Sequence, residues 1–520
     1  MQVNGAVDKT MGPVVENYRT EKKVKTEEAE ANNNIPASDT ASSGFLGNLL
    51  VVPMDGSHWV GIKAIAQEMG RRGHRVTVLI PEISIRMGPG KHYDTVTYPV
   101  PYDKAHIDSI MSSNKDMMQT SAHSFTEKIW KGFSKIQKIT GFIHTTAESL
   151  LFNVSLISHL AQQNFDAVLT DPMVPTGSLI ARKFGIPTIN LLRGIPCSLD
   201  MKSAGCPSPP SYVPRFLTRY TDKMSFQERA FNTLVALLEP LLCRLLYWHF
   251  DQIAYQFLGE EVGIAEVLSE SAIWLLRMDF TLEFPRPIMP NVVLVGGINC
   301  NVRHPLPEVR SWVSGEHGFV VFTLGTMLSD LPEETTSVFL EAFRQIPQKV
   351  IWRYTGQVPD SFPENVKLMK WVPQNDLLAH PGARAFITHA GSHGLFEGLC
   401  HAVPMVMMPI AGDQADNAVR FASRGAGVVL DIYSITTESL LQGLNEVIND
   451  TSYLMKKKLL KSRYKENMQK LPAVLDLNWL QYYCLDVIAV LATVVLFFVI
   501  LIVKCLKLCL WKLSRKRKQD

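Results

Sequence analysis

The sequence predicts an α/β chain in which two successive domains of alternating strands and helices precede one membrane-spanning helix. Its 520 residues are too many for one ordinary hydrophobic core. Short apolar runs, typical of buried parallel strands, alternate with helical stretches in two series, and a Pro-rich passage at 285–290 separates them. An uncharged apolar run at 487–503 follows the second series.

The first series is expected to form a Rossmann-like domain over residues 45–290. Apolar runs at 49–53 and 75–80 flank a helical pattern at 59–71, and together they indicate a strand–helix–strand unit. The same alternation continues, with strands expected at 165–170 and 186–190 and helix-prone stretches at 124–163 and 225–258.

The second series is expected to form another Rossmann-like domain over residues 291–470. Its apolar runs predict strands at 292–295, 319–324, 350–354, 385–388 and 404–408. Two such domains in succession imply a cleft between them. Neither half has a G-x-G-x-x-G run after a strand, so a nicotinamide oxidoreductase lacks support.

The apolar run at 487–503 is expected to span a membrane, with a length of about 25 Å as a helix. Aromatic residues precede it, and the basic tail at 504–520 follows it. The positive-inside rule places such a tail in the cytoplasm and the bulk of the chain in a lumen. The sequons at Asn153 and Asn449 are compatible with glycosylation there.

The leader at 1–44 argues against a lumenal location of the two domains. It is polar and charged, is expected to be disordered, and holds no apolar stretch that could serve as a signal sequence. Without a signal, a lone C-terminal span can also insert with the two domains in the cytosol. The residues leave both orientations open.

Charge and cysteine spacing exclude several functions. The net charge is +3 and the basic residues are spread out except at the C-terminus, so no nucleic-acid partner is expected. No metal site is expected either, because the cysteines lack C-x-x-C pairs and no D-x-D pair stands in a suitable place. Cys197 and Cys206, in a Pro-rich loop, are a candidate disulfide.

The densest group of polar and small residues follows the later strands of the second half. It comprises Trp371, Gln374, His389, Gly391, Glu397, Asp413 and Gln414. A nucleotide sugar needs such residues: a flat face for its base, a carboxylate for its ribose diol and acceptors for its sugar hydroxyls. We expect Trp371 to stack on the base, and Asp413 and Gln414 to accept hydrogen bonds from the sugar.

A phosphate site is expected where the strand at 385–388 meets the next helix. Free backbone N–H groups near Gly391 and the helix dipole can hold phosphates without a metal. His389 adds a side-chain donor. Glu397, about two helical turns further on, can reach the ribose.

His58 and Asp171 are the candidate catalytic residues. Histidine titrates near neutrality and suits removal of a proton from a hydroxyl, and a carboxylate on its other nitrogen would fix its tautomer. Each also has an ordinary interpretation, since a lone histidine is often structural and an aspartate before proline often caps a turn. The surrounding run, Asp-Gly-Ser-His-Trp, favours catalysis.

Together these motifs resemble those of the animal UDP-glucuronosyltransferases, a family of UDP-glycosyltransferases. The resemblance rests on the W-V-P-Q run at 371–374, the H-A-G-S-H-G run at 389–394 and the G-D-Q run at 412–414, and it covers nearly all of 49–449 and the membrane span. It implies a GT-B fold whose C-terminal half binds the UDP-sugar and whose N-terminal half binds the acceptor. It also implies donor contacts at Thr326, Trp371, Gln374, His389, Glu397, Asp413 and Gln414, with Asn375, His393 and Asn417 as further candidates.

The resemblance further implies an inverting transfer of glucuronic acid from UDP-glucuronate to hydroxyl groups of small lipophilic acceptors, giving β-glucuronides and UDP. His58 would be the base and Asp171 its partner. Arg277 is a candidate contact for the sugar carboxylate, although an arginine after a strand is also common on surfaces. No cofactor beyond the UDP-sugar is expected.

The expected partners are the UDP-sugar, the acceptor, the lipid bilayer and related enzymes in homo- or hetero-oligomers. The lysines near the C-terminus resemble the signal that keeps family members in the endoplasmic reticulum, where they serve detoxification.

Two alternatives stay open. The donor could be another UDP-hexose. The chain could instead be a catalytically impaired membrane partner of active enzymes, because the segment at 453–479 is shorter than in the family and the leader is unusual.

Overall fold

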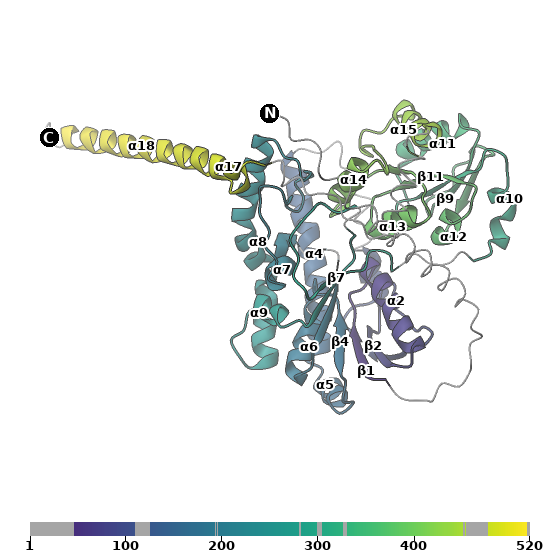
Figure 1. The fold of residues 1–520 in the computed structure, drawn as a ribbon, viewed down its shortest axis with the longest axis horizontal. Helices are drawn as coiled ribbons and strands as arrows, with labels where there is room; N and C mark the ends of the chain where they lie inside the picture. The colour runs from purple at the N-terminus through teal and green to yellow at the C-terminus, as the bar shows by residue number, and fades with distance from the viewer. Residues whose placement is uncertain are drawn as a thin grey trace, which may run out of the picture. The chain divides into compact units, whose positions relative to one another are not determined.

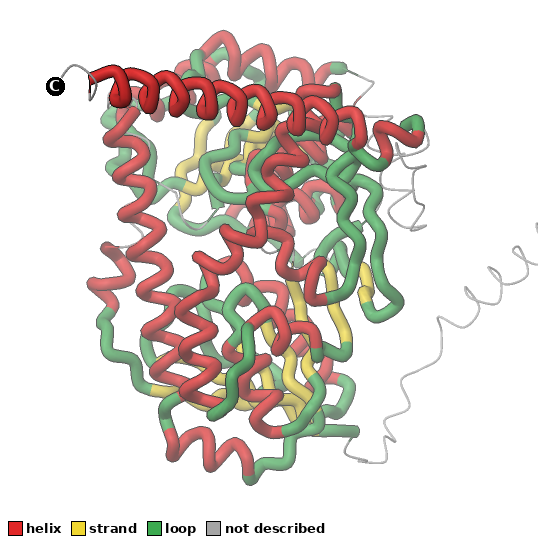
Figure 2. The backbone as a smooth tube through the Cα atoms, turned by 90° about the vertical axis from the view of Figure 1, so that its left-hand side faces the viewer, coloured by secondary structure: helices red, strands yellow, loops and turns green. Residues whose placement is uncertain are grey.

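The computed structural model describes residues 46–109, 125–192, 194, 196–279, 282–298, 304–325, 330–450, 453 and 477–516. The whole of the expected leader at 1–44, residues 454–476 of the segment at 453–479 and the last four residues lie outside these ranges. The described strands form two separate parallel sheets, which the views in Figures 1 and 2 show as two groups with helices packed over them.

The first sheet has seven strands in the order β3-β2-β1-β4-β5-β6-β7. The order reverses between β1 and β4, which is the switch point where doubly wound sheets bind ligands. The strands are β1 (Asn48–Val52), β2 (Arg75–Pro81), β3 (Asp94–Tyr98), β4 (Ala167–Thr170), β5 (Thr188–Leu192), β6 (Ile273–Leu276) and β7 (Val292–Leu294).

Side chains on β1 alternate between two cores, as the period of a strand requires. Leu49 and Val51 pack with α2 on one face, and Leu50 and Val52 pack with α4, α6, α8 and α9 on the other. The helices of this half are α2 (Ser57–Arg71), α4 (Phe125–Leu151), α5 (Val154–Ala161), α6 (Thr176–Phe184), α7 (Leu199–Ser203), α8 (Phe226–Leu258) and α9 (Ile264–Ser269), with the short 3₁₀ helix η3 (Pro196–Ser198).

The second sheet has six strands in the order β10-β9-β8-β11-β12-β13, so its switch point lies between β8 and β11. The strands are β8 (Phe319–Thr323), β9 (Lys349–Arg353), β10 (Val366–Met369), β11 (Ala383–Thr388), β12 (Met405–Met407) and β13 (Gly427–Val429). Around it lie η4 (Pro307–Val309), α10 (Arg310–Val313), α11 (Glu333–Arg344), α12 (Gln374–Leu378), α13 (Ser392–Cys400), α14 (Gln414–Ser423) and α15 (Thr437–Asn449).

The expected strands are confirmed, each with ends within two residues of the prediction. The expected boundary between the halves needs a correction. The apolar run at 292–295 forms β7, which pairs with β6 in the first sheet, so this sheet extends beyond residue 290. The Pro-rich passage lies between two strands of one sheet and does not separate the domains.

The C-terminal region forms α17 (Trp479–Tyr482) and α18 (Leu485–Lys516). Residues Leu485–Leu508 are apolar and long enough to cross a membrane, and few of them are buried. The single-span prediction at 487–503 lies inside this helix. The long helix α8 also passes the test of length and composition, with more of its residues buried.

Candidate active site

His58 and Asp171 meet at the switch point of the first sheet. His58 lies in the first turn of α2, directly after β1, and Asp171 directly follows β4. Val52 and Thr170 are partners in the parallel pairing of these strands, so both residues leave the sheet at the same edge. The fold therefore joins residues that are 113 positions apart.

The two side chains form a close polar pair. His58 Nδ1 lies 2.5 Å from Asp171 Oδ2, and Asp171 is only 3% exposed. The other Asp171 oxygen accepts a hydrogen bond from the backbone N–H of Met173 at 3.0 Å. A carboxylate held in this way orients the imidazole through Nδ1, which leaves Nε2 as the nitrogen that can accept a proton.

Asp55 secures the loop that brings α2 to this position. Its carboxylate accepts hydrogen bonds from the backbone N–H groups of Gly56 at 2.6 Å, Ile85 at 2.6 Å and Arg86 at 3.1 Å. Gly56 has φ of 79°, a left-handed conformation that favours glycine. The loops after β1 and β2 are thereby tied together at the edge of the sheet.

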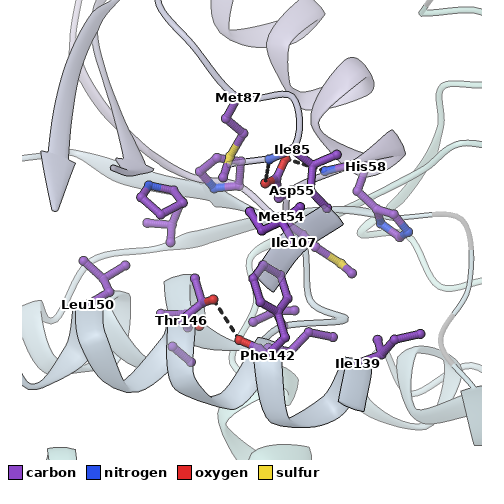
Figure 3. Close-up of a pocket in the computed structure, with 18 of the residues that line it drawn as sticks. Met54, Asp55, His58, Ile85, Met87, Ile107, Ile139, Phe142, Thr146 and Leu150 are labelled. Carbon is purple, nitrogen blue, oxygen red and sulfur yellow. Dashed lines mark hydrogen bonds between the residues drawn. The ribbon is translucent and has the colours of Figure 1, made fainter. Parts of the chain in front are cut away.

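An apolar cavity of about 230 Å³ opens beside His58. Figure 3 shows Asp55, His58, Ile85 and Met87 on one side and residues of α4 on the other. The α4 side chains include Ile139, Phe142, Ile143, Thr146, Ala147 and Leu150. The cavity offers few polar groups, one of them the hydroxyl pair of Tyr102 and Thr146 at 2.9 Å.

His389 lies at the switch point of the second sheet, between two glycines. A Cβ atom at Gly325 would come within 2.5 Å of His389 Cε1, and one at Gly391 within 2.5 Å of His389 Nε2. Ala390 has φ of 62°, which turns the chain sharply from β11 into α13. The glycines thus leave just enough room for the imidazole beside the helix start.

Glu397 and Gln374 form the neighbouring polar pair. Gln374 Nε2 donates to Glu397 Oε2 at 2.5 Å. Burial raises the pKa of the Glu397 carboxyl to about 7, although the hydrogen bond from Gln374 and the charge of Arg277 oppose this shift. The carboxyl group therefore changes its charge near neutral pH.

Trp371 is 57% exposed and carries two arginines over its ring. The guanidinium carbons of Arg86 and Arg353 each lie 5.5 Å from the ring centroid. Burial lowers the pKa of Arg86, against the charges of Asp55 and Glu397. Arg86 comes from the first half of the chain, so both halves surround this tryptophan.

Three further polar residues of the predicted site, Asp413, Gln414 and Asn417, lie at the start of α14. Asp413 Oδ2 accepts from Asn417 Nδ2 at 2.9 Å, and the same amide donates to the backbone oxygen of Ala390 at 3.3 Å. Gln414 Oε1 accepts from the N–H groups of Ile410 at 2.7 Å and Ala411 at 3.0 Å. Asn417 thereby links the loop of Asp413 to the turn after His389.

Arg277 joins the two switch points. Its Nη1 lies 2.7 Å from His393 Nε2 at the start of α13, and its Nη2 lies 2.9 Å from His393 Nδ1. A Cβ atom at Gly61 of α2 would be 3.0 Å from the same Nη1. Arg277 is buried, so it is no surface arginine. Helix α2, which carries His58, and helix α13, which follows His389, thus face each other across one guanidinium group.

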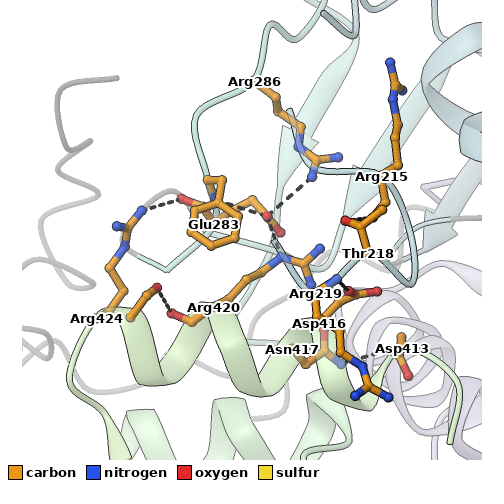
Figure 4. A network of polar contacts seen from close by, with 12 residues as sticks. Arg215, Thr218, Arg219, Glu283, Arg286, Asp413, Asp416, Asn417, Arg420 and Arg424 are labelled. Atoms are coloured by element: carbon orange, nitrogen blue, oxygen red, sulfur yellow. Dashed lines mark hydrogen bonds and ion pairs between the residues drawn. The ribbon is translucent and has the colours of Figure 1, made fainter. Parts of the chain in front are cut away.

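A second network holds α14 against the first half (Figure 4). The Asp416 carboxylate accepts from the backbone N–H groups of Leu217 at 2.7 Å and Arg219 at 2.9 Å. Arg420 Nε lies 2.8 Å from the buried carboxylate of Glu283. Burial alone would raise the pKa of Glu283, but Arg420 and Arg286 lower it, so the carboxylate is ionised.

Known proteins resemble this chain over nearly its whole length. The family model described as UDP-glucoronosyl and UDP-glucosyl transferase matches residues 47–471 and 462–520. The chain belongs to this family. It is 41% identical over 490 residues to UDP-glucuronosyltransferase 1A1 of Mus musculus, covering 89% of this chain and 91% of that protein. The human protein of the same name is 41% identical over 501 residues, covering 91% and 94%.

Solved structures confirm the GT-B fold. The spinosyn forosaminyltransferase SpnP aligns with a TM-score of 0.56 at 18% identity, covering 81% of this chain and 96% of that one. Os79 from O. sativa, determined in complex with UDP, aligns with a TM-score of 0.52 at 16% identity, covering 82% and 97%. This member of the family is a glycosyltransferase. The enzyme uses a UDP-sugar as co-substrate and needs no further cofactor.

Four predicted residues of this UDP-glycosyltransferase remain to be placed: Thr326, Asn375, Asn153 and Asn449. Thr326 lies outside the described residues. Asn375 follows Gln374 on α12, and its Oδ1 lies 2.8 Å from His401 Nε2. Asn153 caps α5, its Oδ1 accepting from the N–H of Leu156 at 3.1 Å, and Asn449 is exposed at the end of α15.

The cysteine prediction was wrong. Cys197 forms a disulfide with Cys243 on α8, and Cys206 is a buried free thiol. The distance along the chain favoured Cys206, but the long helix α8 returns to the loop at 196–198 and presents Cys243 there.

Sequence reasoning missed Arg86, Arg353, Asp416 and Glu283. Arg86, Arg353 and Glu283 belong to no recognised motif, and Asp416 lies in the polar run after β12 without an expected role. Each acquires its role through partners in other elements. The spacing of Asp416 and Arg420 on one face of α14 was the only local signal.

Proposed function

We propose that this glycosyltransferase transfers glucuronic acid from UDP-glucuronate to hydroxyl groups of small lipophilic acceptors, with inversion at the anomeric carbon. The observation that carries the proposal is the His58–Asp171 pair at the mouth of the apolar cavity. Relatives over nearly the whole chain are named UDP-glucuronosyltransferases, which supports this donor.

The acceptor binds in the cavity beside His58. Its apolar walls favour a lipophilic body, and the Tyr102–Thr146 hydroxyls offer a hydrogen bond to a polar substituent. A volume of about 230 Å³ suits a molecule with a few rings. The reacting hydroxyl then points towards His58 Nε2.

The donor binds at the second switch point. In this proposal Trp371 stacks on uracil, Gln374 and Glu397 bind the ribose, and the helix start at Gly391 receives the diphosphate beside His389. Asn375 and His393 border this site, and Asn417 supports it from behind. Asp413 and Gln414 accept from the sugar hydroxyls, and the buried Arg277 pairs with the sugar carboxylate.

The reaction needs one proton acceptor and one leaving group. His58 Nε2 takes the hydroxyl proton as the acceptor oxygen attacks the anomeric carbon. The bond between that carbon and the β-phosphate oxygen breaks, and UDP leaves with the electron pair. Asp171 stabilises the imidazolium ion that forms. Attack from the side opposite UDP turns an α-linked donor into a β-glucuronide.

We place the enzyme in the endoplasmic reticulum membrane with α18 as its anchor, its two domains in the lumen and its basic tail in the cytoplasm, serving detoxification. The Cys197–Cys243 disulfide supports an oxidising compartment. If this orientation is right, glycosidase treatment removes glycans from wild type, and Asn153→Gln with Asn449→Gln abolishes the mobility shift. An unglycosylated wild type would favour the cytosolic orientation.

A donor panel tests the activity. Membranes carrying the full chain are incubated with phenolic and steroid alcohols and with UDP-glucuronate, UDP-glucose, UDP-galactose or UDP-N-acetylglucosamine. We expect a β-glucuronide, identified by mass and by β-glucuronidase cleavage, as the main product. Faster transfer of another hexose would correct the donor, and UDP binding without any turnover would favour a catalytically impaired partner, which the comparisons do not favour.

A further inference from the structure

Helix α8 carries an exposed apolar face that the site described above does not use. The face is formed by Leu234, Leu237, Leu238, Leu241, Leu242 and Leu245, all of them exposed. Phe231 and Trp248 extend it at its two ends. Isolated exposed leucines are common on soluble proteins, but a continuous patch of this kind marks a contact surface.

The opposite side of α8 is built for protein contact and not for lipid. Asn232 Nδ2 donates to the backbone oxygens of Pro210 at 2.7 Å and Val213 at 3.0 Å. Glu239 lies 3.3 Å from the buried guanidinium of Arg215. Because this side belongs to the core of the first domain, α8 cannot cross a bilayer as an isolated span.

The first turn of α8 is fixed to the start of the expected membrane anchor. Arg229 Nη2 lies 2.5 Å from Asp486 Oδ2 of α18, and Thr233 Oγ1 lies 3.6 Å from Cys484 Sγ. The rings of Tyr212 and Tyr482 stack with centroids 6.1 Å apart. The apolar face of α8 therefore begins where α18 enters the membrane.

The directions of α8 and α18 allow α8 to lie along a membrane that α18 crosses. Figure 1 shows α8 running across the direction of α18 and not alongside it. If α18 stands along the membrane normal, α8 lies roughly along the membrane surface. Its exposed side can then face lipid while its other side keeps its contacts with the first domain.

Lipid fits this face better than a second helix does. A partner helix usually packs on a narrow apolar seam with charged residues on both sides of it. On α8 the seam would be Leu234, Leu238, Leu241 and Leu245. The residues beside it, Leu237 and Leu242, are apolar as well. From Phe231 to Cys243 the one charged residue is Glu239, which points inward to Arg215. Arg244 and Trp248 at the far end are residue types that favour the interface between lipid and water.

We propose that the apolar face of α8 lies in the interfacial layer of the lipid bilayer, as a second membrane contact beside α18. This inference rests on the proposed membrane anchor, and it adds a consequence for the proposed activity. Helix α4, which lines the acceptor cavity, packs on α8 through the rings of His144 and His249, 4.1 Å apart. The cavity is then one helix away from the lipid in which lipophilic acceptors dissolve.

Site-specific photocrosslinking of the full chain tests the proposal. Leu241→p-benzoylphenylalanine is reconstituted in phosphatidylcholine vesicles that contain a radioactive lipid and is then irradiated. Phe497→p-benzoylphenylalanine in α18 is the positive control, and Val358→p-benzoylphenylalanine, an exposed apolar position in the second domain, is the negative control.

We expect a lipid adduct at Leu241 similar to that at Phe497 and at least about tenfold stronger than that at Val358. A crosslinked dimer at Leu241 would assign the face to a second copy. An adduct at Leu241 no stronger than that at Val358, while Phe497 reacts with lipid, would overturn the proposal. No lipid adduct at Phe497 would instead contradict the membrane anchor on which the proposal rests. Glucuronide formation by the same vesicles reports on the proposed activity separately, because crosslinking requires no turnover.

Discussion

At the scale of single residues, the site depends on two close polar pairs, each formed by residues from different elements. Asp171 lies 2.5 Å from His58, and Gln374 lies equally close to Glu397. All four positions could be inferred from the sequence. His58, Asp171 and Gln374 follow a strand or start a helix, and Glu397 lies on the helix that follows β11. Arg86 could not, since it reaches Trp371 only after the two halves have come together.

Asp171→Asn should impair the chemical step and leave the fold intact. The amide fills the same space but cannot stabilise the imidazolium ion, so we expect kcat to fall by about 10²-fold or more with little change in donor KM. Initial rates at saturating donor measure this loss. Asp94→Asn, at an exposed position of β3, is the matched control, and an equal loss in both variants would contradict a catalytic role for Asp171.

Glu397 should make donor binding depend on pH. Its pKa of about 7 keeps the carboxyl protonated in acid, whereas the ribose diol needs the ionised form as an acceptor. Donor KM should therefore fall as the pH rises, by about tenfold between about pH 6 and about pH 8. The stability of the folded state should fall as the pH rises. A carboxyl group with a raised pKa stabilises the fold most at low pH, and this stabilisation is lost as the pH approaches 7.

The pH profile of Glu397→Gln provides the check. The amide does not titrate, so donor KM should become nearly independent of pH across the same range. Glu341→Gln, exposed on α11, should keep the wild-type profile. A pH dependence that survives in Glu397→Gln would assign the titration to another group.

At the scale of elements, the strand–turn–helix units at the two switch points bring the functional residues together. Apolar runs predicted the strands next to these points because they are buried on both faces. The edge strands β3, β10 and β13 were missed, since Asp94–Tyr98 is polar and the others are short. Strand β7 was assigned to the wrong half, because sheet membership depends on pairing and not on local sequence.

Gly391→Ala tests the turn between β11 and α13. Its added methyl group would come within 2.5 Å of His389 Nε2, so the imidazole must move while the helix, whose φ at this position is −65°, tolerates alanine. We expect donor KM to rise about tenfold, equivalent to about 1.4 kcal/mol of binding. Gly141→Ala, which meets nothing within 4 Å, should leave donor KM unchanged. Unaltered KM in Gly391→Ala would show that His389 does not contribute to donor binding.

At the scale of the whole molecule, α14 connects donor binding with the joining of the halves. Its first residues form part of the proposed sugar site, while Asp416 and Arg420 bind the first half. The sequence predicted two domains and a cleft, but not the contacts that close it. Those contacts use backbone N–H groups of Leu217 and Arg219 in left-handed conformations, which no local pattern indicates.

Arg420→Met should destabilise the protein strongly. It leaves the buried Glu283 carboxylate without its closest partner, and the loss of one member of a buried pair costs about 3–5 kcal/mol. The midpoint of thermal unfolding in detergent measures the effect. Arg344→Met removes an exposed pair with Glu341 and should cost at most about 0.5 kcal/mol. Equal midpoints for the two variants would mean that the network of α14 does not hold the halves together.

The central claim is that His58 accepts the proton of a hydroxyl that attacks a sugar bound at the other switch point. The most direct measurement is single-turnover transfer from labelled UDP-glucuronate to a phenol by wild type and by His58→Ala, with UDP affinity measured on the same samples. We predict that the wild type forms the β-glucuronide and that His58→Ala binds UDP equally well but forms almost none. Full transfer by His58→Ala, or an α-linked product from the wild type, would contradict the account.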